Sequence, residues 1–165
     1  MKEFTANNSV WTIRNCKEFK SFKKYIICPR IFAPIMQVYK IKHLQLFFRI
    51  NPPSLVRALN IMRKRINNGE KIFYLLDKNN EVALYFFLIG HNKPFVLILP
   101  GGGYGDVCSL VEGYEIAIKL NELGYNAFIG QYRVGKKALH PNPQDDVATF
   151  INFINNNAHK MSVDT

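Results

Sequence analysis

The chain has 165 residues, of which 48% are hydrophobic, and this size and composition predict a single folded domain rather than a disordered polypeptide. Its longest apolar stretches, residues 82–90 and 94–103, are too short to span a bilayer, and residues 1–19 contain no apolar segment typical of a signal peptide. The net charge of +10 is concentrated in residues 1–75, where 15 Lys and Arg face three acids. Because the basic residues are scattered and form no recognisable nucleic-acid module, we interpret them as solvated surface and expect neither nucleic acid nor membrane as a partner.

The three cysteines, Cys16, Cys28 and Cys108, are far apart in the sequence and odd in number. This pattern favours free thiols in a reducing compartment over a disulfide framework or a zinc site, so we expect a cytoplasmic protein. No set of His, Cys, Asp or Glu has metal-ligand spacing, and the sequence predicts neither a metal nor an organic cofactor.

Residues 1–50 are predicted to form an N-terminal cap of mainly helical or irregular structure, with a short basic helix over residues 17–27 that ends before Pro29. Residues 51–165 are predicted to form a second unit that begins with a helix. Asn51-Pro52 is a helix-entry signal. The apolar residues that follow have the spacing i, i+4, i+7 and i+11, which places them on one face of a helix: Leu55, Leu59, Met62 and Ile66.

The rest of the chain alternates between strands and helices. Residues 71–76 and 81–89 predict an antiparallel hairpin, and residues 95–99 predict a central strand because they are apolar on both faces. A helix from Ser109 to about Leu123, a strand over residues 126–134 and a helix that opens at Asn142-Pro143 and frays at residues 155–157 follow. This order predicts an α/β layer fold with a parallel component.

Helical periodicity also predicts buried faces. The helix after Ser109 should bury Leu110, Tyr114, Ala117 and Ile118, and the last helix should bury Val147, Phe150, Ile151 and Ile154.

Several polar residues have two interpretations. Ser109 and Glu112 fit the S-x-x-E capping box. Cys108 stands beside a helix N-terminus, which lowers a thiol pKa, so it and His140 could form a nucleophile–base pair; we favour an ordinary packing residue at the junction. We interpret Asp145 and Asp146 as partners of the helix dipole rather than as acid/base carboxylates. Arg133 is predicted to form a structural ion pair or cap.

Three consecutive glycines between a buried strand and a helix need a reason, because such a loop lets a ligand approach backbone N–H groups. A Walker A loop requires Gly-Lys-Ser/Thr, which is absent, and a dinucleotide loop requires a glycine where Asp106 or Cys108 stands. An oxyanion hole suits the position after the third strand. The candidate residues are Gly101, Gly102, Gly103 and Tyr104, and a glycine turn without a ligand is the alternative.

Five sequence blocks carry a resemblance to a known family: Pro100-Gly-Gly-Gly-Tyr-Gly105, Cys108-Ser-Leu-Val-Glu-Gly113, Leu120-Asn-Glu-Leu-Gly-Tyr125, Tyr132-Arg-Val-Gly135 and Pro143-Gln-Asp-Asp146. In this order and spacing they resemble bacterial α/β-hydrolases, in the esterase/lipase branch that includes acetyl esterases and acetylxylan or feruloyl esterases. The resemblance covers about residues 70–160. Residues 1–50 resemble the N-terminal extension of that branch.

The resemblance implies an incomplete α/β-hydrolase sheet: the first four strands with flanking helices, plus the N-terminal extension. In the family a fifth strand, the nucleophile elbow G-x-S-x-G, and the triad Asp and His come later. No serine of this chain is flanked by those glycines, and Ser162-Val-Asp164 resembles the approach to the fifth strand. We therefore expect a truncated or split carboxylic-ester hydrolase that is inactive alone.

The intact enzyme would take a small acyl-ester substrate, and a complementary C-terminal chain is an expected partner. Two other classes stay open. One is a non-catalytic remnant or interaction module that uses the basic N-terminal half, and the other is a diverged nucleotide-binding α/β domain.

Overall fold

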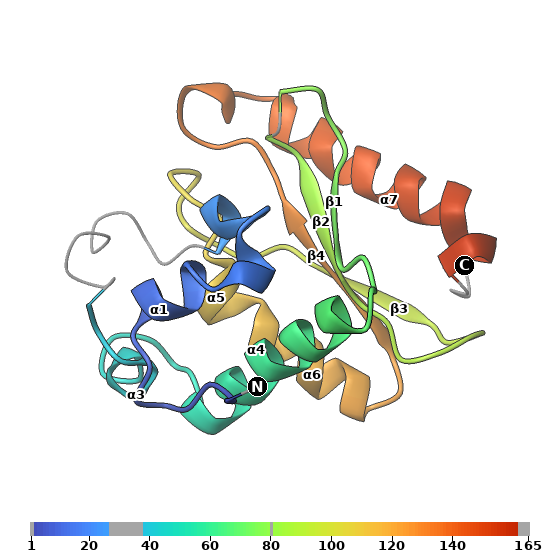
Figure 1. The fold of residues 1–165 in the computed structure, drawn as a ribbon. Helices are drawn as coiled ribbons and strands as arrows, with labels where there is room; N and C mark the ends of the chain where they lie inside the picture. Colours follow the sequence, from blue (N-terminus) through green and yellow to red (C-terminus); the bar gives the residue numbers. More distant parts are fainter. Residues whose placement is uncertain (1, 27–37, 80, 162–165) are drawn as a thin grey trace.

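The computed structural model describes residues 2–26, 38–79 and 81–161, which build a mixed sheet with helices on both faces (Figure 1). The strands are β1 (Phe73–Leu75), β2 (Ala83–Phe87), β3 (Phe95–Ile98) and β4 (Asn126–Gln131), in the order β1-β2-β4-β3. β2 is antiparallel to both β1 and β4, whereas β3 is parallel to β4. The predicted α/β architecture with four strands is confirmed.

β2 begins later and β4 ends earlier than predicted, because carboxylates accept the backbone N–H groups just beyond these strand ends. The Asp77 carboxylate accepts hydrogen bonds from the N–H groups of Glu81 and Val82, both at 2.8 Å, so β2 begins only at Ala83. The Asp146 carboxylate accepts the N–H of Arg133, beyond the end of β4 at Gln131. A carboxylate that satisfies an N–H group ends a strand ladder without leaving an unpaired donor.

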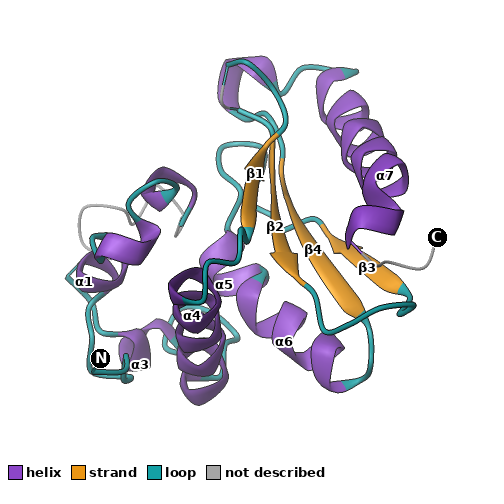
Figure 2. Ribbon diagram, turned by 45° about the vertical axis from the view of Figure 1, so that its right-hand side comes forward, coloured by secondary structure: helices purple, strands orange, loops and turns teal. Residues whose placement is uncertain are grey.

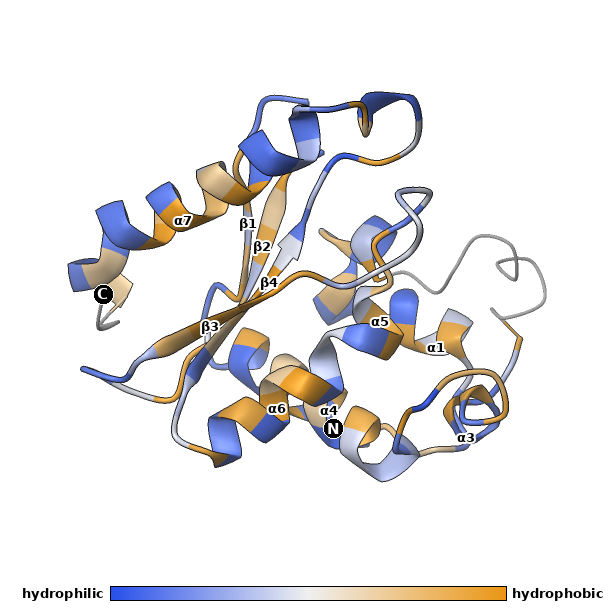
Figure 3. Ribbon diagram, turned by 180° about the vertical axis from the view of Figure 1, so that it is seen from behind, coloured by the Kyte–Doolittle hydropathy of each residue, from blue (hydrophilic) through white to orange (hydrophobic). Residues whose placement is uncertain are grey.

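The two faces of the sheet carry different helices (Figure 2). α4 (Pro52–Asn67), α5 (Ser109–Glu112) and α6 (Tyr114–Glu122) lie on one face with α1 (Val10–Arg14) and α3 (Ile41–Leu44) of the N-terminal segment, whereas α7 (Asn142–Met161) lies on the other. Figure 3 shows that the strands between these layers are largely hydrophobic. Among the described helices, none is both long and apolar enough to cross a membrane.

α4 forms as the sequence predicts. The Asn51 side chain accepts the N–H of Ser54 at 3.1 Å, and Pro52 occupies the first helical position, where its missing N–H costs nothing. Leu55, Leu59 and Met62 are buried on its inner face, and Ile66 is partly buried.

The predicted basic helix over residues 17–27 is wrong for its described part, residues 17–26. That segment forms two 3₁₀ turns, Lys17–Phe19 and Lys23–Tyr25. Phe19, Phe22 and Tyr25 are all buried, and their spacing of three residues matches the three residues per turn of a 3₁₀ helix. Cys28, Pro29 and residues 162–164 lie outside the described residues.

The N-terminal segment shares its core with the sheet. The Phe22 ring stacks on Phe73 of β1 at 5.1 Å between centroids and meets Tyr85 of β2 edge-on at 5.7 Å. Such aromatic pairs add roughly 0.5–1.5 kcal/mol beyond burial. Residues before and after position 50 therefore pack in one hydrophobic cluster. The division at residue 50 stays a prediction.

The helix predicted from Ser109 to Leu123 is broken at Gly113, between α5 and α6. A Cβ at Gly113 would lie 2.7 Å from the Ser109 carbonyl oxygen and 3.1 Å from Ile129 of β4, so glycine permits the close contact. The predicted buried face of the helices is confirmed, because Leu110, Tyr114, Ala117 and Ile118 are all buried.

α7 differs from its prediction in two respects. It continues to Met161 instead of fraying at residues 155–157, and of the residues predicted for the core, Ile151 is 41% exposed and Val147 is only partly buried. Phe150 and Ile154 are fully buried as predicted. A Cβ at Gly130 of β4 would lie 2.6 Å from the Phe150 ring, so this glycine lets α7 approach the sheet closely.

Candidate functional site

The glycine loop follows β3 directly and borders a cleft of about 350 Å³. All four predicted site residues, Gly101, Gly102, Gly103 and Tyr104, line this cleft. The other walls come from the end of β3, the end of β4 and the start of α7, through Leu99, Pro100, Tyr132, Pro143 and Val147. The lining contains no charged side chain, so the cleft suits an uncharged group beside polar backbone.

The backbone of the loop requires glycine at its centre. Gly102 has a φ of 144°, and a Cβ there would lie 2.2 Å from the carbonyl oxygen of Asp106. Gly103 and Tyr104 also have positive φ, 58° and 57°. Positive φ is strained for a tyrosine, and such strain persists only where the surrounding structure holds it.

Five hydrogen bonds hold the carbonyl groups of the loop, including one from the Asp106 N–H to the Gly102 carbonyl at 3.2 Å. The Tyr132 hydroxyl donates to the Pro100 carbonyl at 2.6 Å, and the Cys108 N–H donates to the Gly101 carbonyl at 2.9 Å. The Gly105 N–H donates to the Gly102 carbonyl at 3.0 Å, inside the loop. The N–H of Gly135 donates to the Tyr104 carbonyl at 2.7 Å and fixes the strained residue from the segment after β4.

Unlike its carbonyl groups, most N–H groups of the loop make no hydrogen bond within the described structure. That of Gly101 donates to a carboxylate oxygen of Glu112 at 2.8 Å. The N–H groups of Gly102, Gly103 and Tyr104 donate to no acceptor in residues 2–26, 38–79 and 81–161. Consecutive unengaged N–H groups in a glycine-rich turn present partial positive charge to a ligand and can hold an anionic oxygen.

The predicted capping box of Ser109 and Glu112 is wrong. The Ser109 hydroxyl donates to the Tyr25 carbonyl at 2.7 Å, and the Glu112 carboxylate binds the glycine loop. Cys108 is the residue before α5, and its side chain makes no capping hydrogen bond. The partners of the Ser109 and Glu112 side chains therefore lie outside their own helix, and the S-x-x-E spacing did not indicate them.

The prediction of a lowered thiol pKa at Cys108 is also wrong. Burial, followed by the negative charges of Glu112 and Asp106, raises the pKa of the Cys108 thiol to about 11. α5 has only four residues, so its dipole is too short to oppose these effects. His140 is exposed, and no hydrogen bond joins it to Cys108 in the described structure. The preferred interpretation of Cys108 as a packing residue agrees with its 1% exposure.

Arg133 forms the structural ion pair that the sequence predicts. Its guanidinium lies 2.7 Å from the Asp146 carboxylate, which also accepts the Arg133 backbone N–H at 2.8 Å. The hydrogen bond to Asp146 raises the pKa of Arg133, so the guanidinium stays charged. Asp145 lies in the first turn of α7 and is exposed, in keeping with the dipole interpretation, whereas Asp146 lies outside that turn and binds Arg133. The ion pair joins the end of β4 to the start of α7, the two elements that carry Tyr132 and Pro143 into the cleft.

Sequence reasoning missed Tyr132 and Glu112 as residues that support the loop. Tyr132 directly follows β4, and the carboxyl ends of parallel strands are the usual place for ligand sites in α/β sheets, so this signal was available. Glu112 gave no comparable signal, because its capping-box spacing indicated a local partner.

Comparison with known proteins shows a likeness to α/β-hydrolases. No known protein-family profile matches it. It is 36% identical over 112 residues to endo-1,4-beta-xylanase B of Butyrivibrio fibrisolvens, which covers 64% of this chain and 18% of that protein. The structure of MGS-M1, an α/β hydrolase enzyme from a Medee basin deep-sea metagenome library, matches with a TM-score of 0.53 and 29% identity, over 56% of this chain and 41% of that one.

A second solved structure, the acetyl ester-xyloside bifunctional hydrolase of Caldicellulosiruptor lactoaceticus, matches with a TM-score of 0.51 and 24% identity, over 56% of this chain and 38% of that one. The sheet order, the flanking helices and these likenesses define a protein with a partial α/β-hydrolase fold. The 29% identity to an α/β hydrolase agrees with the resemblance to α/β-hydrolases that the five sequence blocks carry. It spans about two fifths of the length of the solved structures.

Proposed function

We propose that the chain carries the oxyanion hole of a carboxylic-ester hydrolase, built by the N–H groups of Gly102, Gly103 and Tyr104. One observation carries this proposal: these three consecutive residues line the cleft after β3, and their N–H groups have no acceptor in the described structure. Gly101 belongs to the same loop, but its N–H is held by Glu112 and orients the loop instead.

The chemistry follows from this placement. When a serine oxygen attacks an ester carbonyl, the carbonyl oxygen becomes an oxyanion, and donors aimed at it stabilise the tetrahedral intermediate. Removing one such donor typically costs about 2.7–4 kcal/mol of transition-state stabilisation. The loop donors need no rearrangement during the reaction, because five hydrogen bonds hold the neighbouring carbonyl groups. A small acyl ester fits the uncharged lining of the cleft.

The nucleophile would come from outside these 165 residues, because no serine here has the flanking glycines of an elbow. Ser109, the serine nearest the loop in sequence, is buried and donates to the Tyr25 carbonyl. We propose that a C-terminal segment, in the same or a separate chain, supplies the serine, Asp and His and pairs with the outer edge of β3. Free thiols at Cys16 and Cys108 support a reducing compartment, the cytoplasm, for this assembly.

Two measurements test the proposal. The 165-residue polypeptide should hydrolyse p-nitrophenyl acetate no faster than its Gly102→Pro variant, and turnover clearly above that control would contradict the need for an external nucleophile. Titration with dimethyl phosphate, a tetrahedral monoanion, should shift the amide NMR signals of Gly102, Gly103 and Tyr104. Two glycines with positive φ elsewhere provide control amides: Gly90 is partly buried, and Gly69 is exposed with its N–H bonded to the Ile66 carbonyl. Equal shifts at all five positions would reject the oxyanion site.

A further inference from the structure

The outer edge of β1 has unengaged backbone groups. Leu76 N–H donates to the Val82 carbonyl and Phe86 N–H to the Ile72 carbonyl, so residues 72, 74 and 76 direct their backbone groups toward β2. Phe73 and Leu75 alternate with them and direct their N–H and carbonyl groups away from the sheet. Within the described residues, these groups have no hydrogen-bond partner.

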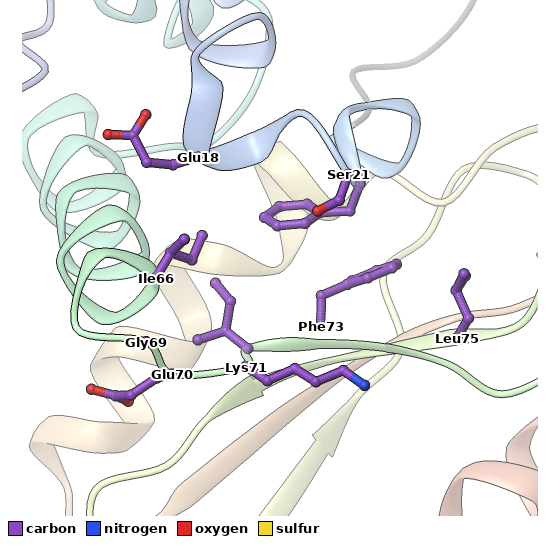
Figure 4. A pocket seen from close by; sticks show the side chains of 10 residues that line it. Glu18, Ser21, Ile66, Gly69, Glu70, Lys71, Phe73 and Leu75 are labelled. Carbon is purple, nitrogen blue, oxygen red and sulfur yellow. The ribbon is translucent and has the colours of Figure 1, made fainter.

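A cleft of about 500 Å³ runs along this edge. Figure 4 shows Ser21 on the N-terminal side, with the side chains of Phe73 and Leu75 rising from β1 toward it and Lys71 extended along the strand. Phe22 and Ile72 line the cleft and are buried, whereas Leu75 is 46% exposed. The cleft therefore combines an apolar floor with strand-edge donors and acceptors.

Among the described residues, the acidic side chains of the cleft form ion pairs, whereas its lysine does not. Its two carboxylates are paired: Glu18 lies 3.1 Å from the Arg63 guanidinium, and Glu70 lies 3.9 Å from that of Arg65. Lys71 also lines the cleft, is exposed and has no carboxylate partner in the part of the chain that the structure describes; its ammonium lies 4.1 Å from the centroid of the Tyr74 ring. The rim thus presents unneutralised positive charge.

We propose that β1 and this cleft bind an extended acidic peptide segment, which adds to the sheet as a strand beside β1. An open strand edge pairs with an extended chain through main-chain hydrogen bonds, and alternate side chains of that chain enter neighbouring pockets. Here, alternate apolar side chains would contact Phe22 and Leu75, while the acidic side chains on the opposite face would meet the Lys71 ammonium beside the Tyr74 ring. β3, the other sheet edge, has four apolar residues and no charge, so it offers no such complement.

The test measures fluorescence anisotropy of a fluorescein-labelled, end-blocked heptapeptide of alternating valine and glutamate with the full chain. We expect saturable binding that weakens with salt. A valine–lysine peptide, and a valine–glutamate peptide with proline at its centre, should each bind about tenfold more weakly, which is 1.4 kcal/mol. Leu75→Pro removes an outward N–H while sparing the bonds to β2, and it should also lower affinity about tenfold. Leu75→Val keeps that N–H and should bind within about twofold of the unaltered chain.

Several results would overturn the proposal. These are equal affinity for the acidic and basic peptides, full binding by the proline-containing peptide, and amide NMR shifts along β3 instead of at Phe73 and Leu75. Loss of binding through self-association of the chain at β1, seen by sedimentation velocity, would assign this edge to a second copy instead. If Leu75→Pro does not fold, the comparison of the three peptides on the unaltered chain decides.

Discussion

The two faces of the sheet differ in how many elements cover them. On one face, α4, α6 and the N-terminal segment enclose a large aromatic and aliphatic core, which includes Phe19, Leu59 and Tyr114. On the other face α7 packs alone, and its buried contacts centre on Phe150 and Ile154. The first face tolerates the loss of one contact better, because several elements share it, whereas the second depends on a few residues.

The glycine loop depends on both faces. Glu112, which holds the Gly101 N–H, comes from α5 on the heavily covered face. Pro143 and Val147, which line the same cleft, come from α7 on the opposite face. The cleft therefore keeps its shape only if the thinly covered face stays docked, and the following changes test that dependence in order of expected effect.

Phe150→Ala should have the largest effect, about 3–5 kcal/mol of unfolding free energy, because the ring is fully buried and the cavity would border Gly130 and the sheet. Urea unfolding measures the change in the free energy of unfolding, and hydrogen exchange should show a selective loss of protection in α7. Leu59→Ala on the other face is the control, with about 2–5 kcal/mol lost and protection lowered throughout. If hydrogen exchange in Phe150→Ala lost protection equally in all elements, the inference that α7 can detach from the sheet by itself would be wrong.

Asp146→Asn should cost about 2 kcal/mol, because it removes the charge that pairs with Arg133 but preserves the side-chain volume. The Arg133 side chain is 26% exposed, so water offsets part of the loss. Amide NMR signals of Pro143-flanking residues and of Tyr104 should shift, since β4 and α7 separate at the cleft. The neighbour Asp145 is exposed, and Asp145→Asn should change stability by less than about 0.5 kcal/mol. Equal effects from the two substitutions would refute a specific role for the pair.

The smallest effect should be a pH dependence on the opposite face. Burial alone would raise the pKa of Glu18, but hydrogen bonds from its own backbone amide and from Arg63 hold that pKa below its usual value. A lowered folded-state pKa stabilises the fold above the unfolded value, roughly 4.3, and this contribution disappears as the pH falls through the folded value.

Glu18→Gln should therefore be less stable than the unaltered chain at pH 7, and the gap should close as the pH falls below about 4. Urea unfolding at both pH values measures it. A gap that is constant with pH would show that Glu18 acts through packing alone.

Local sequence signals predicted those parts of the molecule whose partners are near in the chain. The Asn51 cap, the apolar face of α4 and the glycine at position 124, which ends α6 with a φ of 92°, all follow from spacing within one element. The 3₁₀ turns at Lys17–Phe19 and Lys23–Tyr25 were predicted as helix, because basic composition hid the three-residue spacing of the aromatic side chains. The break at Gly113 was missed because it depends on contact with Ile129.

The sequence by itself determined the alternation of strands and helices, the position of the glycine loop and the resemblance to α/β-hydrolases, because periodicity and motif spacing are properties of neighbouring residues. Only the tertiary structure decided which loop amides remain unengaged. Glu112 binds Gly101 instead of capping its own helix, and Tyr132 and Gly135 bind the loop from the end of β4. Hydrogen bonds form between groups that folding brings together, and parallel pairing of β3 with β4 brings these distant segments to one end of the sheet.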